Sequence, residues 1–113
     1  MDAAKIPMRL SVTGAVAAGG TLQAVLLIGH PMESGFRTMD SGQRIAKNVI
    51  ESVQVYLDDG LLFQMQTGIG IASNPYVAFS VPLPSVLPAH AVVLRVTWQD
   101  DKGQRGAIER VLR

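Results

Sequence analysis

The sequence has no cysteine among its 113 residues, few aromatic side chains (5%) and few charged ones (17%). Without cysteine, this chain has no disulfide, no thiolate nucleophile and no cysteine-ligated zinc. No run of about 18 apolar residues predicts a transmembrane helix. The first residues, Met1 to Lys5, lack the basic and then apolar pattern of a signal peptide. These absences remove several classes of protein before any motif is considered.

The chain also lacks an excess of either sign of charge, because it has ten Lys and Arg residues and nine Asp and Glu residues, for a net charge of +1. A nucleic-acid-binding domain clusters its basic residues, and no block of like charges occurs here. We therefore expect neither nucleic acid nor membrane as a partner. Hydrophobic residues make up 48% of the chain, which is enough for one core. Residues 1–113 are expected to form a single domain.

Hydrophobic and polar residues alternate along seven short segments, which is the period of a half-buried β-strand. Turn-forming residues separate many of them, such as Gly19-Gly20, Asp58-Asp59-Gly60 and Asn74-Pro75. The pattern predicts an all-β protein, an antiparallel β-sandwich of about seven strands, with a weak helical pattern only at 44–50. The predicted strands are 8–13, 22–28, 49–57, 61–66, 76–81, 92–98 and 106–112.

Two of these strands carry more specific expectations. In the segment 22–28, both faces are apolar, because Val25 and Leu27 lie opposite the main hydrophobic set. This composition favours a central strand that is buried on much of both faces. Trp98, near the end of the segment 92–98, is expected to lie in the core.

The connection between the second and third strands, residues 29 to 47, is the longest stretch without a period of its own. Connections this long in compact domains are usually functional or disordered. Apolar residues within it, such as Met32 and Phe36, favour an ordered loop that projects from the sandwich. Such residues either pack on the end of the sandwich or form an adaptable contact surface. We expect Met32, Glu33 and Ser34 to form a projecting tip, with Phe36 and Arg37 at its base.

Several residue types in the chain also occur in catalytic and metal sites. His30, Glu33 and Ser34 are the types of a hydrolase site, but they crowd one loop, whereas a triad normally draws on separate elements. His30 and His90 with a carboxylate would suffice for a metal, but no spacing supports that site. The segment 67–73 contains two glycines but lacks the following helix of a phosphate-binding loop, so a bulge or loop is expected there. We therefore expect no catalytic activity, no cofactor and no metal.

Three segments resemble the SoxZ family, the Z subunit of the SoxYZ thiosulfate-oxidation carrier. They are Gly-His-Pro-Met-Glu-Ser-Gly at 29–35, Ser-Asn-Pro-Tyr-Val-Ala-Phe at 73–79, and Val-Thr-Trp-Gln-Asp-Asp-Lys-Gly at 96–103. The resemblance runs from about residue 8 to the C-terminus, and the first segment is its most specific part. It implies an immunoglobulin-like β-sandwich, in agreement with the predicted strands.

The resemblance also implies a function. In that family, a Y subunit carries sulfur intermediates on a cysteine in a flexible arm, and Z is a non-catalytic platform in a periplasmic heterodimer. It implies a SoxY-type partner, transient contacts with other thiosulfate-oxidising enzymes, and export together with the partner. Without SoxY, we expect self-association, a homodimer, through the same surface. The candidate partner-binding residues are His30, Pro31, Met32, Glu33, Ser34, Gly35, Phe36, Asn74, Pro75 and Tyr76.

Two other readings remain open from the residues alone. One is a generic β-sandwich binding module, for a carbohydrate for example, although exposed rows of aromatic residues would be expected for it. The other is a small hydrolase that uses His30 and Glu33, which a pH–rate profile would reveal. For the loop itself, the alternative to recognition is that His30 and Glu33 hydrogen-bond the loop to itself.

Overall fold

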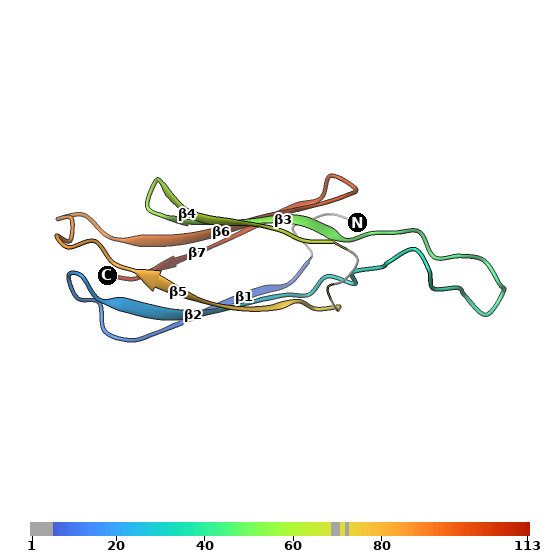
Figure 1. The fold of residues 1–113 in the computed structure, drawn as a ribbon, viewed down its shortest axis with the longest axis horizontal. Helices are drawn as coiled ribbons and strands as arrows, with labels where there is room; N and C mark the ends of the chain where they lie inside the picture. The colour runs from blue at the N-terminus through green and yellow to red at the C-terminus, as the bar shows by residue number, and fades with distance from the viewer. Residues whose placement is uncertain (1–5, 69–70, 72) are drawn as a thin grey trace.

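Seven strands form two antiparallel sheets that pack face to face as a β-sandwich (Figure 1). The computed structural model describes residues 6–68, 71 and 73–113. One sheet has the order β1-β2-β5 and the other the order β4-β3-β6-β7. The predicted all-β sandwich of about seven strands is confirmed. The strands are β1 (Met8–Thr13), β2 (Thr21–Ile28), β3 (Ile50–Leu57), β4 (Gly60–Gln66), β5 (Tyr76–Pro82), β6 (Val93–Asp100) and β7 (Arg105–Val111).

The described ranges contain no helix, in agreement with the all-β prediction, and the weak helical pattern at 44–50 is not realised. A single isolated turn of helix is costly to nucleate. Within 44–50, Arg44 and Asn48 instead form isolated antiparallel bridges with Thr38 and Glu33. No helix in these ranges is long and apolar enough to span a membrane.

The hairpin between β3 and β4 keeps β4 in the same sheet as β3. In an immunoglobulin constant domain, the fourth strand instead joins the sheet that contains the first and second strands. The likeness therefore lies in the sandwich architecture and not in the placement of every edge strand. The turn is built on Asp58, which has a left-handed backbone (φ 52°). Two hydrogen bonds with Val93 hold Asp58 in place. The Val93 N–H donates to the Asp58 carboxylate at 2.9 Å, and the Asp58 N–H donates to the Val93 carbonyl at 2.7 Å.

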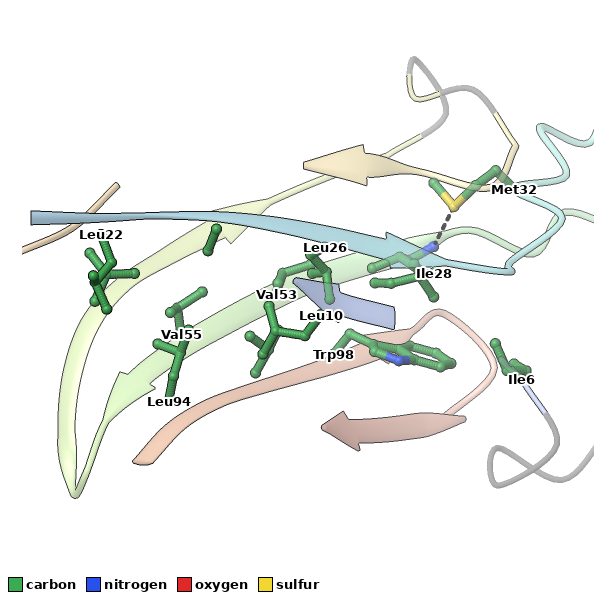
Figure 2. Close-up of a cluster of buried hydrophobic side chains, with 14 of the residues drawn as sticks. Ile6, Leu10, Leu22, Leu26, Ile28, Met32, Val53, Val55, Leu94 and Trp98 are labelled. Atoms are coloured by element: carbon green, nitrogen blue, oxygen red, sulfur yellow. Dashed lines mark hydrogen bonds between the residues drawn. The ribbon is translucent and has the colours of Figure 1, made fainter. Parts of the chain in front are cut away.

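The core lies between the facing sides of β2, β3 and β6 (Figure 2). Along β2, alternate residues are buried, and β2 is central in its sheet as predicted. Its other face is open, with Gln23 exposed and Val25 and Leu27 half-buried. The expectation of burial on both faces is therefore wrong, because no further layer of the described chain covers that side. The fully buried set includes Leu22, Leu26, Ile28, Val55, Leu94, Val96 and Trp98.

Trp98 is in the core, as predicted, with 1% of its surface exposed. Its indole Nε1 donates to the sulfur of Met8 at 3.2 Å, which ties β6 to the opposite sheet. The cross-strand neighbour of Trp98 on β7 is Gly106. A Cβ atom on Gly106 would lie 2.3 Å from the indole Nε1. The ring therefore occupies space that only a glycine leaves free.

Replacing Gly106 by alanine should destabilise the protein. The added methyl group would meet a buried aromatic ring, and overpacking of this kind costs about 1–3 kcal/mol. Gly68→Ala is the matched control, because a Cβ there meets nothing within 4 Å. Urea denaturation of both variants measures the difference in the free energy of unfolding. Equal stability of the two variants would contradict the close approach between Gly106 and Trp98.

Candidate functional site

Between β2 and β3 the chain extends away from the sandwich as a narrow ribbon, residues 29–49, here called the arm (Figure 1). Its two legs run antiparallel and bridge at Glu33–Asn48 and Thr38–Arg44. Glu33 and Asn48 exchange both backbone hydrogen bonds, each at 2.8 Å. The prediction of an ordered, projecting loop is confirmed, and its order comes from pairing between its own legs.

The base of the arm is built on His30, whose side chain is fully buried. The ring Nδ1 accepts a hydrogen bond from the Met32 N–H at 3.0 Å, so this nitrogen carries no proton. The ring Nε2, 3.0 Å from a carboxylate oxygen of Asp100, is then the donor. The His30 carbonyl also accepts from the Asn74 N–H at 2.8 Å. His30 therefore joins the arm, the end of β6 and the segment before β5.

Asp100 is almost fully buried and its carboxylate is surrounded by donors. One oxygen accepts from the N–H groups of Lys102 (3.0 Å) and Gln104 (2.8 Å), and the other accepts from His30 and the Gln104 side chain. With its amide nitrogen turned toward the carboxylates, Asn48 adds a further donor at 3.0 Å. Burial raises the pKa of Asp100, but the hydrogen bonds from His30, Gln104 and Lys102 outweigh it and hold the pKa below its usual value.

Met32 does not project from the arm, so that part of the expectation is wrong. Its side chain is 6% exposed and turns into the end of the sandwich, where the sulfur accepts from the Ile50 N–H at 3.3 Å (Figure 2). Its backbone is left-handed (φ 51°), a conformation unusual for a non-glycine residue. The hydrogen bond to His30 and the burial of the thioether offset that strain.

Further along the arm, the two residues expected to anchor its base, Phe36 and Arg37, are exposed. Phe36 is 71% exposed, and the Arg37 side chain is 66% exposed, so neither forms the base. Arg37 instead binds the carboxylate of Glu33 through its guanidinium, with Nε at 3.2 Å. This hydrogen bond lowers the pKa of Glu33 and raises that of Arg37. The arm thus presents an aromatic ring beside a neutralised ion pair.

The two predicted partner-binding segments lie together, as the hydrogen bond from Asn74 to His30 shows. A groove of about 450 Å³ separates the arm base from the segment before β5 and is lined by residues that include Glu33, Arg37 and Asn74. A second recess of about 510 Å³, here called the inter-sheet cleft, opens between the sheets. Met32 and Ile71 line both recesses.

Burial divides the ten candidate partner-binding residues. Three of them, His30, Met32 and Pro75, are buried in this structure, and their contact with a partner stays a prediction. The remainder reach the surface to differing degrees, and contact with a partner stays a prediction for them. They are Pro31, Glu33, Ser34, Gly35, Phe36, Asn74 and Tyr76.

The structure does not assemble the catalytic residue types found in the sequence. The Ser34 hydroxyl accepts from the Phe36 N–H at 3.2 Å, Glu33 binds Arg37, and both nitrogens of His30 are engaged elsewhere. His90 is exposed and contacts the Ala91 carbonyl. Within the described ranges, no three His, Cys, Asp or Glu residues are grouped to hold a metal. In the segment 67–73, residues 69, 70 and 72 lie outside the description, and with them the predicted bulge or loop.

Fold and site together define a small immunoglobulin-like β-sandwich that carries an ordered arm on a buried histidine–aspartate pair. Residues 8–110 match the family described as sulphur oxidation protein SoxZ, so the chain belongs to the SoxZ family and is a subunit of a sulfur-oxidation (Sox) system. No curated protein is significantly similar in sequence.

Solved structures share the sandwich at low sequence identity. The superoxide reductase (neelaredoxin) of Ignicoccus hospitalis aligns with a TM-score of 0.65 and 16% identity, covering 94% of this chain and 78% of that one. A variant of the same protein aligns with a TM-score of 0.69 and 17% identity, covering 98% and 82%. A hypothetical protein from Pyrococcus horikoshii OT3 has a TM-score of 0.54 and 10% identity, covering 94% and 85%. These likenesses show the fold alone.

Replacing Asp100 by asparagine should make stability less dependent on pH in the acid range. A carboxylate whose pKa is lowered in the folded state stabilises that state when the pH is above the usual carboxyl pKa of 3.8. This stabilisation is lost as the pH falls through the pKa of the folded state. At neutral pH the variant should be less stable by about 1–3 kcal/mol, because its amide nitrogen faces donors. This gap in stability between the variant and the unmodified protein should narrow below about pH 4.

Thermal denaturation from neutral to strongly acid pH measures this gap, and Asp59→Asn in the exposed β3–β4 turn is the control. A gap that stays constant with pH would show that the Asp100 carboxylate is not specifically stabilised in the folded state.

Proposed function

We propose that this chain is the non-catalytic subunit of a SoxYZ-type sulfur carrier and serves as a platform for a SoxY-type subunit. Its membership of the SoxZ family carries the proposal. The cysteine content is consistent with it, because a chain with no cysteine has no thiol on which to hold sulfur. The sulfur is carried by a cysteine on an arm of the SoxY subunit, and the heterodimer works in the periplasm, to which both subunits are exported together.

The platform role suits a rigid surface, because a flexible arm on the partner gives reach while recognition needs fixed geometry. In this chain the arm base supplies fixed geometry through the His30–Asp100 pair. The exposed part of the arm supplies contact area, with Phe36 71% and Met39 49% exposed. Large exposed apolar side chains on an ordered ribbon are typical of interaction sites. Contacts with SoxY and, transiently, with other thiosulfate-oxidising enzymes are assigned to this arm.

Co-expression with a SoxY-type subunit should yield one stable complex on size exclusion. After incubation with thiosulfate and the other Sox enzymes, mass spectrometry should find added sulfur on the SoxY chain and the unmodified mass for this chain. The physical reason is that a thioether or hydroxyl does not form a persulfide under conditions in which a thiolate does. Two separate monomer peaks, or a stable sulfur adduct on this chain, would contradict the platform role.

Substitutions on the arm should slow the reconstituted pathway without unfolding the protein. Phe36→Ser removes an exposed anchor, and losing a contact worth about 1 kcal/mol or more should lower turnover about fivefold or more. Glu33→Ala should act in the same direction, because it frees Arg37 from its ion pair. Melting temperatures should stay nearly unchanged, since both side chains lie outside the core.

Val86→Ser is the matched control, because Val86 is 80% exposed and lies at the other end of the sandwich, near the start of β2. It should change neither turnover nor melting temperature. If Phe36→Ser or Glu33→Ala lowers stability while turnover per folded complex is intact, the arm serves folding and not recognition.

A further inference from the structure

The strand β7 ends the four-stranded sheet, and its outer edge pairs with no other strand of the described chain. The Leu112 N–H donates to Val92, and the Gln104 carbonyl accepts from Asp100, so even-numbered residues direct their backbone groups toward β6. Because successive residues of a strand alternate, Arg105, Ala107 and Glu109 direct their N–H and C=O groups outward. Within the part of the chain that the structure describes, the edge of β7 is therefore a row of unpaired donors and acceptors.

The side chains of the same three residues lie on the solvent face of the sheet. Their neighbours on β6 are Gln99 for Arg105, Thr97 for Ala107 and Arg95 for Glu109. All three side chains on β7 are exposed. β1 of the other sheet lies near β7, and Met8 at the start of β1 contacts Trp98 of β6. The outward edge and the solvent face of β7 are thus presented together.

We propose that β7 pairs antiparallel with β7 of a second copy of this chain, about a two-fold axis at Ala107. In that register, Arg105 lies opposite Glu109 of the other copy, and Glu109 lies opposite its Arg105. Opposite charges directly across a strand pair are stabilising, and the small Ala107 meets itself on the axis. Odd-numbered residues face odd-numbered residues, so all the outward backbone groups find partners.

Charge selects both this edge and this register. The edge strand β1 has one charged residue, Arg9, which cannot pair with its own copy favourably. The edge strands β4 and β5 have no charged residue, and β5 ends in Pro82. Shifting the axis to Ile108 would place Glu109 opposite Ala107 and leave both charges without a partner. Of the four strand edges, β7 alone is complementary to itself in charge.

The proposed pairing joins two four-stranded sheets into one of eight strands. Strands run along the long axis of the molecule, and the arm leaves from one end of it (Figure 1). The two-fold symmetry at β7 turns the second copy end for end along its long axis. The two arms therefore leave at opposite ends of the dimer. The dimer therefore leaves both arms accessible, so the proposed self-association uses the edge of β7 and not, as expected from the sequence, the surface assigned to SoxY.

A single strand pair buries less than the roughly 1,000 Å² of a stable interface, so the dimer is expected to be weak and is best captured covalently. The chain has no cysteine, so one introduced thiol reports one contact. Opposite residues of a hydrogen-bonded pair have Cα atoms about 5.5 Å apart, which suits a disulfide. Ala107→Cys should form disulfide-linked dimers under mild oxidation, and Ala78→Cys, an exposed alanine within the edge strand β5, is the control.

The rate of disulfide formation at Ala107→Cys should exceed that at Ala78→Cys by about tenfold or more, given a fixed geometry. Adding Arg105→Glu should slow it, because glutamates would then oppose Glu109 of the other copy, and adding Glu109→Arg should slow it likewise. Mixing these two slowed variants should restore the rate in mixed dimers alone, since each charge again meets its opposite. High salt should weaken the contrast.

Equal rates at Ala107→Cys and Ala78→Cys would overturn the proposal. So would slow disulfide formation in the mixture of charge variants, because only the symmetric register predicts its recovery. Melting temperatures of all variants are measured alongside, and a folded Ala107→Cys protein that stays monomeric under oxidation refutes the pairing directly.

Discussion

The hydrogen bond between His30 and Asp100 connects parts of the chain that share no strand pairing, and the arm depends on it. Asp100 ends β6, and His30 follows β2 in the opposite sheet. Both side chains are fully buried, and every polar atom of the pair has a partner. A buried polar group that loses its partner costs about 1–3 kcal/mol, so the pair is stabilising only while it stays complete. That condition fixes the distance between the two sheets at the end from which the arm departs.

The geometry of the arm follows from this connection. The second nitrogen of His30 holds the Met32 N–H, which keeps Met32 in a left-handed conformation that sterics disfavour. The turn directs the Met32 thioether inward, against the Ile50 N–H at the start of β3. Both legs of the arm are thereby attached to the sandwich before they begin to pair with each other. An exposed ribbon of this length would otherwise have little to hold its direction, because its own legs bridge at only two points.

How far the sequence predicts this molecule depends on whether a feature is local. The alternation of apolar and polar residues predicts the strands, and residues such as Asp58 and Gly19 predict turns. Both can be predicted because each signal is contained within a few neighbouring positions of the sequence. The contact between His30 and Asp100 spans 70 positions and leaves no local period. In the sequence, Asp100 stands out only as a member of the segment 96–103 that resembles the SoxZ family. Met32 and Phe36 were equally apolar in sequence, and only the backbone direction set by His30 decides which of them is buried.

The two predicted partner-binding segments show the same division. Their identity followed from a resemblance to the SoxZ family, and the structure brings the two segments together through the hydrogen bond between Asn74 and His30. Their exposure could not be inferred from residue type, since His30 is buried and Tyr76 is 65% exposed. The outer face of β2 misled for a related reason. Val25 and Leu27 indicated a covering layer, whereas the described fold leaves them half-buried at the surface.

A fold shared with superoxide reductases does not by itself give this chain redox chemistry, because function resides in sites and not in architecture. The state of the buried histidine bears on the question directly. Its Nδ1 lone pair accepts the Met32 N–H, and its Nε2 carries the proton donated to Asp100. Neither nitrogen can ligate a metal or take a proton from a substrate unless a hydrogen bond at the base of the arm breaks. In this member of the sandwich architecture, the histidine that most resembles a catalytic group holds the arm in position.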